Sequence, residues 1–321
     1  MKKVCVLGKG LLGYHLRWLL DQYGYKQPSY RQIDSLDFTI PSDADEVFKL
    51  SKGCTHYVNA AGFSCGITGN LEKPYHSFFE NSQIVMQLLS AARSQSHIEK
   101  FVTILTSCAY GDTGEILEEK NFLKSEPNPT VAPHGYSKRN AFLTGLYLSR
   151  QFNFPAYGFV LNNLYGPRDK FDGTGKVATS LIGKIVRAKV QHLDSITLFG
   201  DGTPRRELIY IMDACHQIIK AMEVYDDPSE PLNLGGGSDV TIKELAETIA
   251  DIADYKGEIQ WDTSRPNGQM RKLLGIDKMT RYKIPLPAHS LHEGLKATHD
   301  WYINNSEKYL KEYVTKTGEV L

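Results

Sequence analysis

Short apolar runs and longer amphipathic stretches alternate along the first half of the chain. The runs predict strands at residues 4–7, 28–31, 57–59, 101–105 and 156–161. Helical spacing of apolar residues predicts helices at residues 11–23, 43–50, 74–92 and 137–152. This alternation is typical of an α/β protein with a doubly wound parallel sheet and helices on both faces. Such sheets bind ligands at the carboxyl ends of their strands, so we expect the functional residues there.

The pattern changes after about residue 163, where glycine, proline and charged loops separate shorter elements. Here we expect strands at residues 195–199 and 208–211, and helices at residues 176–190, 212–224, 241–255 and 291–304. The sequence therefore predicts a larger N-terminal domain, residues 1–163, into which later segments cross back. A smaller C-terminal domain, residues 164–321, follows it.

The loop after the first predicted strand has the spacing G-x-G-x-x-G. Its residues are Gly8, Lys9, Gly10, Leu11, Leu12 and Gly13. The first glycine permits a tight turn, the second lets the backbone approach a pyrophosphate, and the third allows close packing of helix on strand. The following helix offers unpaired N–H groups to the phosphates. A glycine loop of this spacing between a strand and a helix therefore predicts a dinucleotide site. The alternative is a tight turn whose glycines only allow close packing.

Charged residues near the end of the predicted 28–31 strand bear on the choice of dinucleotide. Arg31 would pair with a 2′-phosphate, which favours NADP, and Lys9 would support it. Asp34 leaves NAD open, because an acidic residue at this place binds the ribose in NAD-binding folds. Asp37 joins Arg31 among the expected cofactor residues. The alternative for Arg31 is a solvated surface side chain.

The overall charge argues against polyanionic partners. In the 321 residues, 37 Lys and Arg balance 37 Asp and Glu, so no general positive field exists to hold nucleic acid or an anionic membrane. No apolar stretch approaches the length of about 18 residues that a membrane span needs. Scattered cysteines without metal-binding spacing predict reduced thiols, no metal site and a cytoplasmic protein. They are Cys5, Cys54, Cys65, Cys108 and Cys215.

Several further motifs give the chain a family resemblance. They read VNAAG at 58–62, LTSCAYG at 105–111, YSKR at 136–139, NNLYGPRD at 162–169, FGDGTPRRE at 199–207 and SRPNGQMRKLL at 264–274. With the glycine loop, they resemble the extended short-chain dehydrogenase/reductases of the NAD-dependent epimerase/dehydratase family. Within that family the chain is most similar to the GDP-L-fucose synthases, the epimerase–reductases of GDP-4-keto-6-deoxymannose. The resemblance extends from the glycine loop to about residue 304.

The resemblance implies a fold, two ligands and an assembly. It implies a Rossmann domain that binds NADP or NAD and a smaller domain that binds a nucleotide-diphosphate sugar, GDP-linked in these relatives. It also implies a homodimer through the helices at 74–92 and 137–152. The reaction is hydride transfer at the sugar 4-position, helped by a Ser/Thr–Tyr–Lys set. In these relatives a Cys and a His also act as acid and base in epimerisation.

The resemblance assigns the first catalytic residues to the end of the 101–105 strand. Thr106 falls on the hydroxyl position, Ser107 is its neighbour, and Cys108 matches the epimerisation cysteine. A small buried side chain at a strand end is the alternative for Cys108. The second epimerisation residue, a histidine in the relatives, falls on Lys176. A buried lysine with a lowered pKa is able to act as a base, whereas a solvent- or phosphate-facing lysine is the alternative.

The Tyr-x-x-x-Lys position departs from the family pattern. Four residues after Tyr136 stands Asn140, so the better register places the lysine at Lys138 and a histidine, His134, at the tyrosine position. Residues four apart share a helix face, so His134 and Lys138 would face the site while Tyr136 points away. His134 is suited to general acid–base work near neutral pH. A retired active site in which His134 fills a polar gap is the alternative.

The same matching gives the remaining ligand residues. Expected cofactor residues beyond the glycine loop are Asn59, Ala60, Ala61, Gly62, Lys138, Leu161, Asn163 and Leu164. Expected substrate residues are Asn163, Lys184, Arg206, Arg271 and Lys272. Arginines bind a diphosphate through paired hydrogen bonds.

Three functions fit these residues. The first is an NAD(P)-dependent oxidoreductase of GDP-linked sugars that resembles the GDP-L-fucose synthases, with epimerisation in doubt because the second epimerisation residue is changed. The second is a GDP-sugar 4-dehydrogenase working in the oxidising direction. The third is a catalytically retired cofactor-binding subunit. Fold alone does not choose among them.

Overall fold

Five parallel strands form the central sheet of the computed structural model, which describes residues 2–64, 66–265 and 267–305. The strand order is β1 (Val4–Leu7), β2 (His56–Asn59), β3 (Lys100–Thr106), β4 (Ala156–Leu161) and β9 (Leu232–Leu234). All four neighbouring pairs are parallel. Their carboxyl ends therefore lie along one edge of the sheet.

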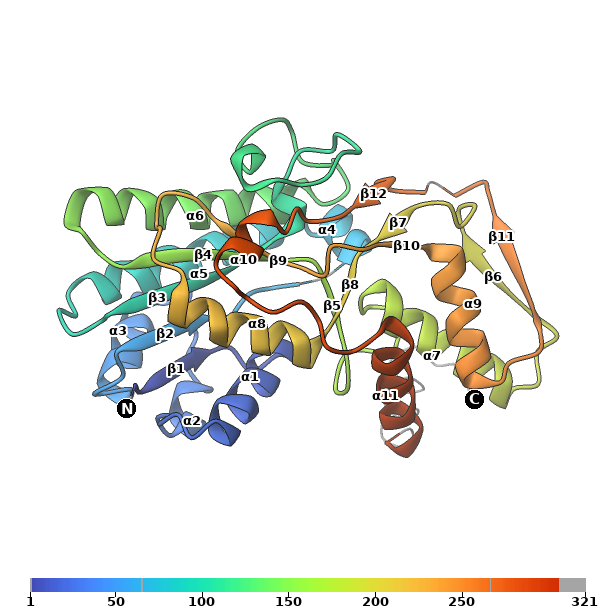
Figure 1. Ribbon diagram of the computed structural model, residues 1–321, viewed down its shortest axis with the longest axis horizontal. Coiled ribbons are helices and arrows are strands. Elements are labelled where there is room, and N and C mark those ends of the chain that lie inside the picture. The colour runs from blue at the N-terminus through green and yellow to red at the C-terminus, as the bar shows by residue number, and fades with distance from the viewer. Residues whose placement is uncertain (1, 65, 266, 306–321) are drawn as a thin grey trace.

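Helices cover both faces of this sheet (Figure 1). Because successive side chains of a strand point to opposite faces, Cys5 and Leu7 pack with α3 (Pro41–Leu50), α5 (Pro74–Arg93) and α6 (Ala132–Phe152). Val4 and Val6 pack on the other face with α1 (Leu11–Gln22) and α8 (Ile211–Val224). The expected doubly wound α/β fold is confirmed.

The predicted strand at 28–31 is wrong. Residues Tyr30–Ile33 form a short helix, α2, and β1 is an edge strand with one isolated bridge between Lys3 and Lys26. The β1 edge that such a strand would have paired with is occupied instead by the side chains of Tyr30 and Arg17.

Side chains satisfy the outer edge of β1 in place of a strand. The hydroxyl of Tyr30 accepts a hydrogen bond from the Val6 N–H at 3.0 Å. The guanidinium of Arg17 donates to the Val6 carbonyl at 2.9 and 3.2 Å and stacks on the Tyr30 ring. The backbone of Val6 is thus paired although no strand lies beside it.

The remaining elements gather at the other end of the molecule or connect the two ends (Figure 1). Small sheets are formed by β5 (Asn163–Tyr165) with β8 (Leu208–Tyr210), β6 (Ser195–Phe199) with β11 (Glu258–Asp262), and β7 (Arg205–Arg206) between β10 (Val240–Thr241) and β12 (Arg271–Lys272). The other helices are α4 (Gly66–Glu72), α7 (Val177–Val190), α9 (Ile242–Ala253), α10 (Asp277–Arg281), α11 (Leu291–Asn304) and the single 3₁₀ turns Ser107–Ala109 and Glu119–Asn121.

A third hydrophobic core joins α7, α9 and α11 with β6. Strand β9, in contrast, returns from this half of the chain to pair with β4 in the central sheet. A domain boundary near residue 163 stays a prediction.

Two sequence expectations concern single features. Across the described ranges, no helix combines the length and apolar character needed to cross a membrane. Cys5, Cys54, Cys108 and Cys215 are free thiols, and Cys65 lies outside the described residues.

Candidate active site

The glycine loop joins β1 to α1 and packs on the loop after β2. A Cβ at Gly13 would lie 2.0 Å from the Gly8 carbonyl oxygen, and one at Gly8 would lie 2.7 Å from the Ala61 nitrogen. Gly8 also has a left-handed φ of 105°, which favours glycine. No side chain caps α1 at Gly10, so the first N–H groups of α1 are available to an anion.

The end of β2 completes this side of the site. Asn59 Oδ1 accepts a hydrogen bond from the Ala61 N–H at 3.1 Å, whereas the buried Asn59 Nδ2 has no partner among the described residues. A Cβ at Gly62 would lie 3.7 Å from Lys138 Nζ. The glycine loop, residues 59–62 and Lys138 are therefore adjacent. Because buried N–H groups are rarely left unpaired, the free Asn59 donor fits a bound dinucleotide.

The residues expected to choose between NAD and NADP are arranged differently from the prediction. Both carboxylate oxygens of Asp34 accept hydrogen bonds from Arg17 at 2.8 Å, and Lys9 Nζ donates to the Asp34 carbonyl at 2.9 Å. An open groove of about 840 Å³ is lined by Lys9, Arg17 and Asp34, together with other residues. Arg31 lies on α2 with an exposed side chain. Asp37 accepts hydrogen bonds from the N–H and hydroxyl of Thr39.

The end of β3 carries the three predicted residues Thr106, Ser107 and Cys108. Thr106 Oγ1 accepts from the Cys108 N–H at 3.3 Å, which caps the 3₁₀ turn. Cys108 Sγ accepts a hydrogen bond from Lys272 Nζ at 3.2 Å. Burial alone would raise the pKa of the Cys108 thiol, but the charge and hydrogen bond of Lys272, the Thr106 hydroxyl and the charge of Lys176 outweigh it, so the pKa is lowered.

The first turn of α6 brings His134 to the same place. A Cβ at Gly135 would lie 2.4 Å from the Cys108 carbonyl oxygen, so the glycine lets α6 pack directly on the end of β3. His134 is partly buried, and its Nδ1 is shielded from solvent without a partner in the described ranges. Burial, followed by the charges of Lys138, Lys176 and Lys272, lowers the pKa of His134 to about 3.

Lys138 and Tyr136 differ in their surroundings. The buried Lys138 donates to the Ile104 carbonyl at 3.0 Å, and burial lowers its pKa to about 8. The Tyr136 ring is 36% exposed and lies near the guanidinium of Arg139. His134, not Tyr136, therefore shares a neighbourhood with Lys138 and Cys108.

Strands β7 and β12 sort four basic side chains onto two faces. The register pairs Arg205 with Arg271 and Arg206 with Lys272. Arg205 and Arg271 both bind the Asp239 carboxylate, at 2.7 and 2.6 Å. Lys272 instead reaches Cys108, and the Arg206 charge also lies near that thiol. No carboxylate within the described residues forms an ion pair with Arg206 or Lys272. The structure does not bring the predicted Arg271 into this group.

Two further predicted lysines have different surroundings. Lys176 lies at the start of α7, where burial lowers its pKa while Asp169 and Cys108 act against that shift. Lys184 donates to the backbone carbonyl of Thr197, which leaves it outside the cation group. Lys176 thus lies near Cys108, whereas the hydrogen bond of Lys184 is made to β6, and its role in substrate binding stays a prediction.

A buried network that the sequence did not reveal holds these residues in place. The Glu207 carboxylate accepts four hydrogen bonds, from the backbone N–H groups of Gly236, Gly237 and Leu274 and from Asn162 Nδ2. Asn162 also accepts from Ser107 Oγ at 2.8 Å and donates to the Lys272 carbonyl at 3.2 Å. Glu207 and Asn162 therefore join the end of β3 to β12.

The other predicted residues after β4 contribute structure around this network. Asn163 Nδ2 donates to the Glu207 carbonyl at 2.9 Å. Leu161 and Leu164 are buried in the core with α1 and α8. A motif containing Asn162 and Asn163 was visible in the sequence, but the partner Glu207 is distant along the chain and only the fold reveals it.

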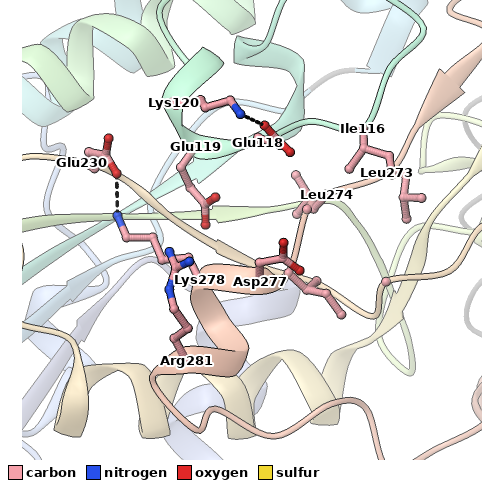
Figure 2. A pocket seen from close by; sticks show the side chains of 13 residues that line it. Ile116, Glu118, Glu119, Lys120, Glu230, Leu273, Leu274, Asp277, Lys278 and Arg281 are labelled. Carbon is pink, nitrogen blue, oxygen red and sulfur yellow. Dashed lines mark hydrogen bonds and ion pairs between the residues drawn. The ribbon is translucent and has the colours of Figure 1, made fainter.

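A separate hollow of about 370 Å³ lies next to the segment that follows Lys272 (Figure 2). Charges of both signs line it. Lys278 binds Glu230 at 2.9 Å, and Glu119 accepts a hydrogen bond from the Asn233 N–H at 3.1 Å. None of the predicted site residues lines this hollow. In the described part of the chain, no group of three or more His, Cys, Asp or Glu side chains is arranged to hold a metal ion.

The fold and the glycine loop together define a dinucleotide-dependent α/β protein with dehydrogenase-type residues at the end of β3. The chain belongs to the NAD-dependent epimerase/dehydratase family, whose sequence profile matches residues 4–235. The resemblance drawn from the motifs is confirmed.

Individual relatives agree with this assignment. The chain is 28% identical to a GDP-L-fucose synthase of Escherichia coli, over 96% of this chain and 98% of the relative. It is 31% identical to a probable GDP-L-fucose synthase of Oryza sativa, over 94% and 92% of the two chains. The solved structure of a GDP-mannoheptose C4 reductase of Campylobacter jejuni with NADP bound matches with a TM-score of 0.82 and 22% identity, over 94% and 98% of the two chains. That last similarity shows the fold alone.

Proposed function

We propose that this protein is an NAD(P)-dependent oxidoreductase of a GDP-linked sugar that transfers hydride at the sugar 4-position. The observation that carries the proposal is the separation of basic residues on β7 and β12. Arg205 and Arg271 share the Asp239 carboxylate, while Arg206, whose charge lies near Cys108, forms no ion pair with a carboxylate of the described residues. An unpaired guanidinium beside predicted catalytic residues suits a diphosphate-linked substrate.

The cofactor is proposed to bind along the carboxyl ends of β1 and β2. The free N–H groups of α1, the unpaired Asn59 Nδ2 and the nearby Lys138 would hold it. Bound there, the dinucleotide supplies or accepts the hydride. The neutralisation of Asp34 by Arg17, with Lys9 alongside, favours the 2′-phosphate of NADP over the free ribose of NAD.

Proton movement is assigned to Thr106, His134 and Lys138. Thr106 and the neutral His134 would bind the sugar oxygen. With a pKa of about 8, Lys138 is largely protonated at pH 7 and lies one helical turn from His134, so it is the proton source for reduction. With Lys176 in place of the second epimerisation residue, we propose reduction without epimerisation at two carbons.

The state of His134 supports a second candidate, oxidation of a GDP-sugar 4-hydroxyl. The pKa of about 3 means that the imidazole is neutral at pH 7. A neutral imidazole has a ring nitrogen free to accept a hydrogen bond, and the hydroxyl substrate of the oxidising direction is the one that donates such a bond.

A pair of absorbance assays tests these candidates. NADPH consumption at 340 nm with GDP-4-keto-6-deoxymannose supports reduction, whereas NAD⁺ or NADP⁺ reduction with a GDP-hexose supports the dehydrogenase. The His134→Ala variant should lose turnover but keep cofactor affinity; unchanged turnover removes His134 from the reaction. Binding of NADPH and GDP with no turnover of any GDP-sugar would instead support a retired subunit.

The assembly proposed is a homodimer through α5 and α6. These helices lie side by side (Figure 1) and carry exposed large side chains that include Tyr75, Phe79, Met86 and Tyr147. Light scattering should give twice the mass of one chain. Met86→Glu should yield monomers, whereas Val190→Glu on α7, equally exposed, should leave the dimer intact.

A further inference from the structure

A lysine from a distant strand is hydrogen-bonded to the Cys108 thiol. Lys272 Nζ lies 3.2 Å from Cys108 Sγ, within hydrogen-bond distance for sulfur. Cys108 is of intermediate exposure, whereas Cys5, Cys54 and Cys215 are buried, so a small reagent is expected to react first with Cys108.

Hydrogen bonds and burial hold the Lys272 backbone in place. Its carbonyl accepts hydrogen bonds from the Glu207 N–H at 3.0 Å and from Asn162 Nδ2 at 3.2 Å. The residue is only 8% exposed. The backbone of Lys272 is thus fixed beside the end of β3, and its side chain has little contact with solvent.

The groups that face Cys108 are nearly all positive or neutral. Lys176 approaches from the start of α7 and Arg206 from β7, and His134 on the first turn of α6 is neutral at pH 7. Two carboxylates act on these cations: Asp112 on Arg206, and Asp169 on Lys176, where Asp169 also accepts hydrogen bonds from Thr179 and the Lys170 N–H. No carboxylate of the described residues forms an ion pair with Lys272.

We propose that Lys272 is a positioning residue that holds Cys108 as a thiolate in the free protein. The consequence is a division of roles, since Lys272 serves the thiol and Arg206 is left as the main cation for the substrate diphosphate. The ion pair itself does not depend on the substrate. Its use in turnover rests on the proposed function.

The pH dependence of Cys108 alkylation by iodoacetamide, followed by peptide mass spectrometry, tests the pair. Only the thiolate reacts, so the wild-type rate should rise with a midpoint below the ordinary cysteine pKa of about 8.5. Lys272→Met should move the midpoint upward, because burial then acts unopposed, and slow alkylation at pH 7 about tenfold or more. Lys272→Arg should restore most of the rate.

The controls make each outcome decisive. Arg271→Met changes the neighbouring residue of the same strand, whose side chain binds Asp239 instead, and should leave the midpoint unchanged. A wild-type midpoint at or above 8.5, or equal midpoints in wild type and folded Lys272→Met, overturns the proposal. If Lys272→Met fails to fold, the wild-type midpoint alone decides.

A binding measurement separates this proposal from the proposed function. In calorimetry, GDP should bind wild type and Lys272→Met within about threefold, and Arg206→Ala much more weakly. A large loss of GDP affinity in Lys272→Met with an unchanged alkylation midpoint would return Lys272 to the diphosphate. Absence of GDP binding in wild type would contradict the substrate class but leave the ion pair standing.

Discussion

The carboxyl ends of β1 and β3 form two halves of one site but are built in different ways. The site at β1 is formed by backbone groups, because the glycine loop leaves the first N–H groups of α1 without a side-chain cap. The site at β3 is formed by side chains from distant segments, since Cys108 contacts Lys272, 164 residues away in the sequence. The backbone site has no room for added atoms at Gly8 and Gly13, whereas the side-chain cluster depends on charge.

The largest effect is expected at Gly13. In Gly13→Ala the new Cβ would lie 2.0 Å from the Gly8 carbonyl, so the loop must shift. We expect a loss of about 3 kcal/mol in the free energy of unfolding by urea, and weaker NADPH binding by fluorescence titration. Gly10→Ala is the control without a steric clash, because no atom lies within 4 Å of the position of its new Cβ. It should weaken NADPH binding while leaving stability nearly unchanged. Equal stability losses in both variants would contradict this account of the loop.

At the β3 end, Arg206→Ala should raise the KM for the GDP-sugar by about 10- to 100-fold, because a charge-assisted hydrogen bond is worth roughly 1.5–3 kcal/mol. The matched variant Arg205→Ala removes a side chain that binds Asp239 and should change KM little. Steady-state kinetics measure both. A fall in kcat with KM unchanged in Arg206→Ala would mean that Arg206 does not bind the diphosphate.

The charge at the β3 end also predicts a pH effect on stability. The folded pKa of His134 is about 3, against an ordinary 6.5, so the unfolded chain binds the extra proton first as the pH falls. This contribution is present above pH 6.5 and is lost between pH 6.5 and 3. From pH 8 to pH 5 the loss is about 2 kcal/mol. Between pH 8 and pH 5, the free energy of unfolding by urea should therefore fall by about 2 kcal/mol less in His134→Asn than in wild type. An equal fall in both proteins would mean that the His134 pKa is not lowered and that its ring contacts water.

A smaller effect is expected at the outer edge of β1. Tyr30→Phe removes the hydroxyl that accepts the Val6 N–H and donates to Gln27 Oε1. Each hydrogen bond lost costs about 1 kcal/mol. Urea unfolding at pH 7 measures the loss, and Tyr23→Phe is a control because the exposed Tyr23 side chain bonds only to the ring of His216. If Tyr30→Phe loses no more free energy of unfolding than Tyr23→Phe, then water pairs with the Val6 N–H at the edge of β1 in place of Tyr30.

The same contrast explains what the sequence predicted. The glycine loop, the sheet and its helices were predictable because their signals are local: a spacing, an apolar run, a helical period. The register that favours His134 and Lys138 over Tyr136 was also local. The strand expected at 28–31 failed because Tyr30 and Arg17 satisfy the β1 edge with side chains.

Residues whose role depends on distant partners were harder to predict. Arg271 and Lys272 are adjacent in the sequence, yet one binds Asp239 and the other Cys108. Only the register of β12 with β7 separates them. Glu207 has no local signal either, because its four donors come from three separate segments.

The most direct test of the central claim, that the two strand ends form one hydride-transfer site, is isotope transfer from NADPH deuterated at nicotinamide C4 to GDP-4-keto-6-deoxymannose. Mass spectrometry and NMR of the product locate the label. We predict one deuterium at the sugar C4 with wild type and with Tyr136→Phe, and none with His134→Ala. Product without deuterium at C4, or loss of transfer in Tyr136→Phe with transfer kept in His134→Ala, would contradict the account.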